Sequence, residues 1–174
     1  MSRVLRALPE TFNASVIVLI HQAPDRVSSL VGLLGRESPL PVVEAEHGAA
    51  LRPGRVIVIP AGKHLLVSRN LGTVLIASGA APPSRPSADL LLATLATAAG
   101  SRAIAVVLSG GGHDAATGAT AIHTCGGTVL ASDEASSASF SMPDATIQRG
   151  HAVDHVVPLD DMAGLLGTLV DNTP

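Results

Sequence analysis

The stretch Ala103-Ile-Ala-Val-Val-Leu108, which runs directly into Ser109-Gly-Gly-Gly-His-Asp114, indicates the fold class. A short run of small aliphatic residues without polar interruptions is typical of a strand that is buried on both faces of a parallel sheet. Similar runs at residues 16–20 and 55–59 predict two more strands of this kind. We therefore expect a parallel sheet at the centre of the molecule.

Helical patterns and turn signals alternate with these strands. Residues 65–68 and 73–77 flank Arg69-Asn-Leu-Gly72, which predicts a β-hairpin. Strands that alternate with helices are typical of a doubly wound sheet. We expect an α/β fold with a doubly wound, mostly parallel sheet, helices on both faces and the hairpin at one edge. Other extended segments are predicted at 39–43, 128–131 and 155–157, and helices at 2–8, from Asp25 to about Gly35, from the capping residue Ser87 to about Gly100, at about 113–125, around 135–140 and 143–149, and from Asp160.

The composition fits one compact domain that spans residues 1–174. Hydrophobic residues are 47% of the chain but aromatic residues only 1%, so the core must consist of closely packed small aliphatic side chains. β-Branched strands covered by helices rich in alanine and leucine provide such a core.

The charge and the cysteine content limit which binding partners and which cellular compartment we expect. A formal net charge of -3 provides no basic field for phosphates, so we expect no nucleic-acid partner. The lone Cys125 can form no internal disulfide, which favours the reducing cytoplasm. The apolar runs are far shorter than the roughly 20 residues that cross a bilayer, so we expect no membrane insertion.

Two polar side chains, His21 and Asp114, follow predicted strands closely. Sites of open parallel sheets form beyond the carboxyl ends of the strands, so both residues are expected at one edge. An aspartate that accepts a hydrogen bond from a histidine fixes its tautomer and stabilises the imidazolium during general base catalysis. On local sequence alone, His21 could equally be a loop residue, and Asp114 could be the N-cap of the helix that follows it.

Other chemistry has weaker support in the sequence. The glycine-rich loop before a helix could hold a phosphate, but it lacks a lysine and matches neither a P-loop nor a dinucleotide fingerprint. The remaining histidines show no metal-ligand spacing, and Cys125 lies at a predicted helix end, where buried thiols are usually inert. We therefore expect no cofactor and no metal.

Six blocks of sequence occur in order across almost the whole chain. They are Val43-Glu-Ala-Glu-His-Gly48, Leu51-Arg-Pro-Gly54, Ile59-Pro-Ala-Gly-Lys-His-Leu65, Arg85-Pro-Ser-Ala-Asp89, Leu108-Ser-Gly-Gly-Gly-His-Asp114, and Ser132-Asp-Glu-Ala-Ser-Ser137 with Met142-Pro143 and Ala145. Together they resemble the catalytic domain of CheB-type chemotaxis protein-glutamate methylesterases. Any one block would be a weak signal, but six in register are specific.

The resemblance implies a Ser-His-Asp triad in which His21 and Asp114 are two of the members. The family's serine lies in a G-x-S-x-G-G turn after its first strand, and no such turn occurs in this sequence. By the family's pattern the serine falls upstream of Met1, so the resemblance implies an N-terminally truncated domain that lacks its nucleophile. If that first strand is central, its loss exposes backbone groups of the neighbouring strands, and we expect marginal stability or association.

The loop before Asp114 departs from the family pattern at two positions. The family usually has methionine where this chain has Gly111, whose backbone amide could still stabilise an oxyanion. Ala115 stands where the family commonly has glycine, so the loop backbone is expected to be held differently. Both departures favour impaired turnover.

For a complete family member, the implied reaction is hydrolysis of glutamyl methyl esters on methyl-accepting chemotaxis receptors, with glutamine deamidation as a related activity. Arg85, in the proline-rich segment, is expected to approach the receptor substrate. A receiver domain encoded upstream would be a further partner. The alternative function is that of an inactive homologue that only binds a receptor or another partner.

Overall fold

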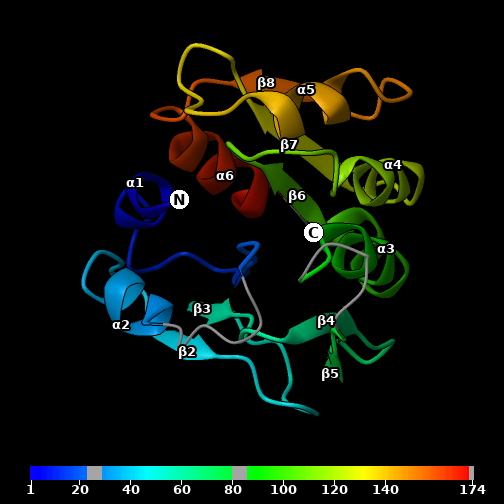
Figure 1. The fold of residues 1–174 in the computed structure, drawn as a ribbon. Coiled ribbons are helices and arrows are strands. Elements are labelled where there is room, and N and C mark those ends of the chain that lie inside the picture. Colours follow the sequence, from blue (N-terminus) through cyan, green and yellow to red (C-terminus); the bar gives the residue numbers. More distant parts are fainter. Residues whose placement is uncertain (23–28, 80–85, 173–174) are drawn as a thin grey trace.

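The computed structural model describes residues 1–22, 29–79 and 86–172 (Figure 1). The strands are β1 (Ser15–Val18), β2 (Val42–Glu44), β3 (Arg55–Val58), β4 (Lys63–Val67), β5 (Thr73–Ala77), β6 (Ile104–Val107), β7 (Thr128–Ser132) and β8 (His155–Val157). The helices are α1 (Ser2–Arg6), α2 (Leu30–Gly35), α3 (Ala88–Ala99), α4 (Ala116–Thr124), α5 (Ser141–Ile147) and α6 (Met162–Asp171), with a 3-10 turn at Gly100–Arg102. Helices and strands alternate in the first and last parts of the chain, and four strands, β2 to β5, follow one another in between.

The strands form two parallel sheets and one antiparallel hairpin. Strands β1, β3 and β2 pair in the order β1-β3-β2, and β6, β7 and β8 pair in the order β6-β7-β8. The hairpin β4-β5 is antiparallel, with Leu65 opposite Leu75. The predicted α/β class, the parallel strands and the hairpin are confirmed. The parallel strands of the described residues do not form one continuous ladder, however, because β1 and β6 are not paired with each other.

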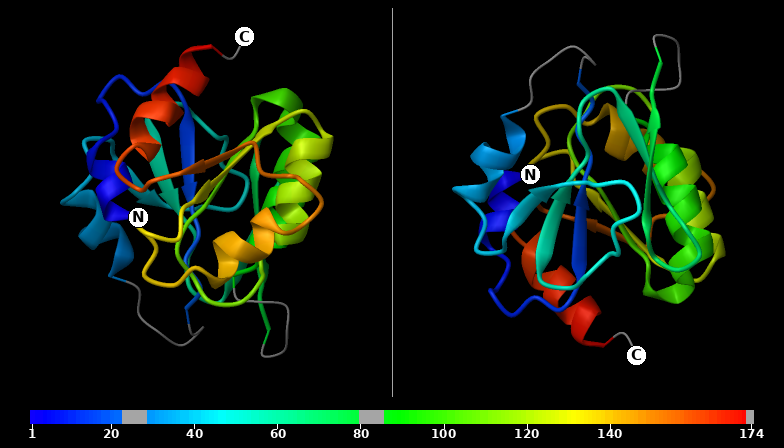
Figure 2. Two further views of the ribbon diagram at one scale, coloured as in Figure 1. Left: turned by 90° about the horizontal axis from the view of Figure 1, so that it is seen from above. Right: turned by 90° about the horizontal axis from the view of Figure 1, so that it is seen from below.

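Helices cover both faces of the β6-β7-β8 sheet, and adjacent residues of β7 show why. Val129 packs with Ala119 and Ile122 of α4, whereas Leu130 belongs to the core that contains Met162 of α6. Successive side chains of a strand point to opposite faces, so one strand serves two helical layers. Both views in Figure 2 show α3 and α4 side by side on one side of the strands and α6 on another.

One core joins the two parallel sheets through aliphatic side chains. It contains Val18 of β1, Val56 of β3, Leu130 of β7 and Leu5 of α1, all at most 2% exposed. No helix within the described ranges is both long enough and apolar enough to cross a bilayer.

Two of the predicted helices differ from the structure, and one predicted helix cap lies outside the described residues. The helix predicted around residues 135–140 is wrong, because this segment is a turn. Asp133 Oδ1 accepts a hydrogen bond from the Ser136 amide at 3.0 Å, and such a side-chain acceptor closes a turn in competition with helical hydrogen bonds. The helix predicted from about residue 113 begins at Ala116, because the glycine-rich loop extends further than the pattern indicated. Asp25, the predicted cap of the second helix, lies outside the described residues.

Helices α3 and α4 approach closely at Gly118. A Cβ atom built on Gly118 would lie 2.5 Å from Cβ of Leu92 and 3.1 Å from Cα of Asp89. Neither of these atoms is the end of a flexible side chain, so the helices could accept a larger residue only by moving apart.

We expect Gly118→Ala to lower the free energy of unfolding by about 2 kcal/mol, because overpacking forces backbone shifts. Gly164→Ala is the matched control, since Gly164 is an exposed helical residue of α6 and its built Cβ meets nothing within 4 Å. That control should keep or raise stability by up to about 1 kcal/mol through helix propensity. Urea denaturation measures both variants. Equal effects of the two substitutions would contradict the close-packing account.

Candidate active site

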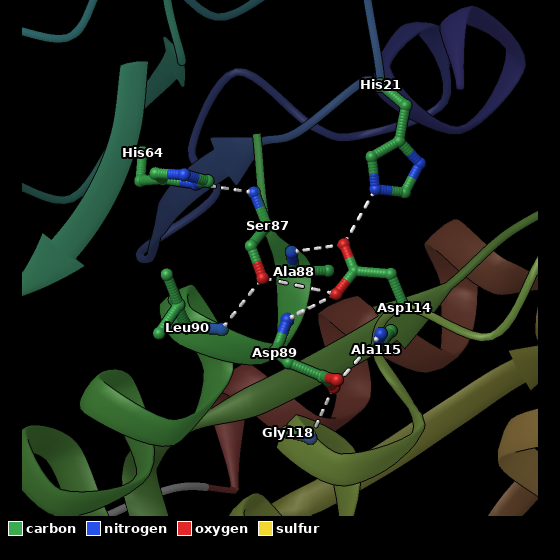
Figure 3. A network of polar contacts seen from close by, with 9 residues as sticks. All are labelled: His21, His64, Ser87, Ala88, Asp89, Leu90, Asp114, Ala115 and Gly118. Carbon is green, nitrogen blue, oxygen red and sulfur yellow. Dashed lines mark hydrogen bonds and ion pairs between the residues drawn. The ribbon is translucent and has the colours of Figure 1, made fainter. Parts of the chain in front are cut away.

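The structure brings His21 and Asp114 into contact, 93 residues apart in the sequence. His21 follows β1, and Asp114 lies in the loop between β6 and α4. Nε2 of His21 lies 2.7 Å from Oδ2 of Asp114. Figure 3 shows the two side chains pointing toward each other. The imidazole is 31% exposed whereas the carboxylate is only 8% exposed. The carboxylate is therefore fixed inside the protein, and the imidazole faces the solvent side of the pair.

Asp114 is held by three further hydrogen bonds, all from the start of α3 (Figure 3). Its Oδ2 accepts from the amide of Ala88 at 2.7 Å, and its Oδ1 accepts from the amide of Asp89 at 3.0 Å and from Oγ of Ser87 at 3.2 Å. Amides at a helix N-terminus lack intrahelical partners and carry the positive end of the helix dipole. The prediction that Asp114 could cap the helix following it is thus wrong, because Asp114 caps α3 instead.

These contacts determine the charge of the carboxylate. Burial raises the pKa of Asp114, but the hydrogen bonds from His21 and from the amides of Ala88 and Asp89 outweigh burial. The net result is a pKa below the ordinary value of 3.8. Asp114 is therefore ionised at neutral pH, and the N–H group of His21 that faces it donates a charge-assisted hydrogen bond.

A second carboxylate, Asp89, caps α4 in return. Its Oδ1 accepts from the amides of Ala115 at 3.1 Å and Gly118 at 2.7 Å. Ala115 adopts φ 104, a left-handed conformation that is unfavourable for residues with a Cβ. The bond from its amide to Asp89 helps to hold this strained residue beside Asp114.

The sequence did not predict all of the hydrogen bonds that hold the His21–Asp114 pair in place. It predicted Ser87 as a helix cap, which is confirmed by the hydrogen bond from the Leu90 amide to Ser87 Oγ at 3.3 Å. It did not predict that Ser87 also bonds to Asp114, or that buried His64 accepts from the Ser87 amide through Nδ1 at 3.0 Å. The one signal for these bonds in the sequence is that Ser87 and Asp89 both belong to the family-like block Arg85-Pro-Ser-Ala-Asp89.

The glycine-rich loop lies beside the pair. Gly110 is fixed by backbone hydrogen bonds, from its own amide to Ser139 and from the amide of Met142 to its carbonyl, at 3.0 and 2.9 Å. The amide of Gly111 has no hydrogen-bond partner within the described parts of the chain. Gly111 and His21 both line a cavity of about 640 Å³ that extends between β1 and β6. Arg85 lies outside the described residues. No cluster of three potential metal ligands occurs in the described portion.

The fold and this pair define a class of α/β protein that presents a histidine and a buried carboxylate at the carboxyl edge of a parallel sheet. Residues 1–166 match the family model described as CheB methylesterase. The chain belongs to the CheB methylesterase family, which confirms the resemblance found in the sequence.

Individual relatives agree with the family match. A protein-glutamate methylesterase/protein-glutamine glutaminase 2 of Anaeromyxobacter dehalogenans (strain 2CP-C) is 41% identical over 172 residues, which cover 97% of this chain and 49% of the relative. The protein-glutamate methylesterase FrzG of Myxococcus xanthus is 37% identical, with 98% of this chain and 51% of FrzG covered. The chain therefore spans about half the length of these relatives.

The solved catalytic domain of the Thermotoga maritima CheB methylesterase has the same fold. It superposes with a TM-score of 0.89 at 33% identity, over 97% of this chain and 90% of that domain chain.

The strain at Ala115 can be measured. We expect Ala115→Gly to raise the free energy of unfolding by about 1 kcal/mol, because relief of the left-handed backbone exceeds the added entropy of the unfolded chain. Ala119→Gly is the control, since Ala119 is buried within α4 and should lose at least about 1 kcal/mol. Urea denaturation of both variants is the measurement. A loss of stability in Ala115→Gly similar to the control would show that Ala115 is not strained.

The ionised state of Asp114 should appear in the pH dependence of stability. Because its folded-state pKa is lowered, the carboxylate stabilises the fold above the unfolded value of about 3.8, and this contribution is lost as pH falls through the lower folded-state pKa. We expect the free energy of unfolding of the wild type to fall more steeply below about pH 4 than that of Asp114→Asn.

The measurement is urea denaturation between pH 2 and 7, with exposed Asp171→Asn as control. The control should keep the wild-type slope in acid. A wild-type slope in Asp114→Asn would mean that the carboxylate gains nothing from its hydrogen bonds.

Proposed function

We propose that this chain carries the acid–base and oxyanion-binding groups of a protein-glutamate methylesterase, in one cytoplasmic domain. Its substrates would be glutamyl methyl esters on methyl-accepting chemotaxis receptors. The observation that carries the proposal is the 2.7 Å contact of His21 with a buried, multiply hydrogen-bonded Asp114, in a chain of the CheB methylesterase family. The relatives are protein-glutamate methylesterases, which supports this substrate class.

The proposed proton transfers follow from the geometry of the imidazole. Nε2 of His21 donates to Asp114, so Nδ1 is the nitrogen that accepts the proton of a nucleophilic hydroxyl. The hydroxyl oxygen bonds to the ester carbonyl carbon, and His21 returns the proton to the methoxy oxygen as the C–O bond breaks and methanol leaves. Water then adds to the acyl intermediate with the same proton transfers. This second step releases the glutamate carboxylate and restores the hydroxyl.

Two groups of the chain would stabilise charge during these steps. Asp114, ionised and held by α3, would stabilise the imidazolium formed at His21. The amide of Gly111 would donate to the oxyanion, since it has no protein acceptor among the described residues and lines the same cavity as His21. Arg85 would approach the receptor substrate. Deamidation of glutamine follows the same path with ammonia as the leaving group.

The nucleophile is assigned to a serine outside these 174 residues, because no G-x-S-x-G-G turn occurs within them. The test therefore extends the chain at its N-terminus by a designed apolar strand and a Gly-Ala-Ser-Ala-Gly-Gly turn. Release of labelled methanol from membranes that contain methylated receptor measures activity. We expect release by the extended chain and none by the 174-residue chain alone.

Substitutions in the extended chain assign the roles. We expect His21→Gln and Asp114→Asn to lower the rate of methanol release by about 10²- to 10⁴-fold. His113→Gln is the control, because His113 is exposed in the same loop and should keep the rate. Release by the unextended chain would refute the external nucleophile. An extended chain without activity, but with receptor binding, would favour the binding-only alternative.

A further inference from the structure

The carboxylate of Asp114 receives four donors, two on each oxygen. Oδ2 faces Nε2 of His21 and the amide of Ala88, both at 2.7 Å. Oδ1 accepts from the amide of Asp89 at 3.0 Å and from Oγ of Ser87 at 3.2 Å. An ionised carboxylate offers about four lone-pair sites. All of them are therefore used, and a rotation of the carboxyl group would break hydrogen bonds on both oxygens.

The donor from Ser87 differs from the two amides because a hydroxyl proton can rotate. The oxygen of Ser87 accepts from the amide of Leu90 at 3.3 Å, which occupies one of its lone pairs. Ser87 is only 1% exposed, so bulk water does not compete for the proton. The hydroxyl proton of Ser87 is thereby directed at Asp114.

The backbone of Ser87 is fixed from the opposite side by a buried histidine. Nδ1 of His64, in β4, accepts from the Ser87 amide at 3.0 Å, and His64 is 3% exposed. A ring nitrogen accepts a hydrogen bond only when it carries no proton, so the proton of the neutral His64 ring lies on Nε2. Figure 3 shows Ser87 between His64 and Asp114. Three buried side chains therefore link the hairpin to His21.

This chain of contacts runs from β4 through the start of α3 to the loop before α4, and from there to the residue that follows β1. Hydrogen bonds in such a buried setting are stronger than in water and polarise one another. Capping of α3 uses the oxygen of Ser87 and not its proton. Loss of either His64 or the Ser87 proton should then loosen the carboxylate that holds His21.

We propose that Ser87 and His64 are positioning residues of the acid–base pair. His64 fixes Ser87, and the hydroxyl of Ser87 fixes Asp114 in the orientation that keeps the proton of His21 on Nε2. The catalytic consequence rests on the proposed function, in which Nδ1 of His21 must be free to accept the proton of the nucleophile. Neither positioning residue touches the substrate. The alternative is that both residues only stabilise the packing of α3 on the hairpin.

Exchange of the His21 Nε2 proton with water tests the positioning in the 174-residue chain, because this measurement needs no nucleophile. Proton NMR with saturation transfer from water gives the exchange rate, and the spectrum of His21→Gln assigns the resonance. We expect Ser87→Ala to raise the rate by about 10- to 100-fold, the range expected when a charged acceptor loses a donor. We expect His64→Leu to raise it by about 10-fold, because the Ser87 amide is left without its acceptor.

Matched variants separate positioning from packing. Ser87→Thr keeps the hydroxyl, and His64→Asn supplies an amide oxygen in place of Nδ1, so both should exchange at a rate close to that of the wild type. Thr94→Val is the control, because Thr94 also ties α3 to β4 by accepting from the amide of Val67 at 3.0 Å. The proton of Thr94 goes to carbonyls of α3 and not to Asp114. Thr94→Val should therefore leave the exchange rate unchanged.

Urea denaturation identifies the conditions in which each variant is folded, and exchange rates are compared under those conditions. If Ser87→Ala does not fold, His64→Leu and His64→Asn give the same comparison with Ser87 intact. Wild-type exchange in both Ser87→Ala and His64→Leu would overturn the proposal. An equal increase in Thr94→Val would also overturn it, since any loosening of α3 on the hairpin would then have this effect.

Methanol release by the N-terminally extended chain measures the catalytic consequence. We expect Ser87→Ala to lower kcat by about 10- to 100-fold with KM unchanged, and Ser87→Thr to keep the wild-type kcat. An active extended wild type whose Ser87→Ala form keeps its kcat would overturn the positioning role and leave the proposed function intact. Faster exchange in Ser87→Ala, without methanol release by the extended wild type, would support the positioning and contradict the proposed function.

Discussion

The rest of the site depends on the hydrogen bonds that the carboxylate of Asp114 accepts. A buried charge needs several hydrogen bonds, and Asp114 receives them from the first turn of α3 and from His21. One side chain thus completes a helix and orients the imidazole that follows β1. Because His21 follows β1 and Asp114 lies between β6 and α4, the pair forms only when the sheets and helices are correctly placed. Structural stability and chemical competence are therefore linked at a single residue.

Patterns of local sequence predicted much of the fold for physical reasons. Aliphatic runs identified the buried strands, because a strand covered by helices on both faces carries apolar side chains on both faces. The capping oxygen of Ser87 and the turn between β4 and β5 are local, so they were also predictable. His21 and Asp114 were placed at one edge by the rule that parallel strands end together. Their contact could not follow from that rule, because strand order is not encoded locally.

What the sequence did not reveal depends on contacts between distant segments. The exchange of caps between α3 and α4 joins residues 25 to 29 positions apart, and no local pattern records it. The turn near residue 135 resembled a helix, and the tertiary hydrogen bond from the Leu159 amide to Ser136 Oγ helps to fix it. No local pattern records the separation of the two parallel sheets, since β1 and β6 have the composition of strands with two partners, and only the resemblance to the family indicated exposed strand edges.

The exchange of caps between α3 and α4 also bears on the order of events during synthesis and maturation. Asp114, in the loop before α4, accepts from the first amides of α3, and Asp89 of α3 accepts from amides at the start of α4, so these bonds form only once the two helices have docked. Such non-local contacts form late, because the intervening chain must first be ordered. A nascent or partly unfolded molecule consequently has no oriented imidazole. The geometry of the pair is therefore present only in molecules in which the two helices have docked.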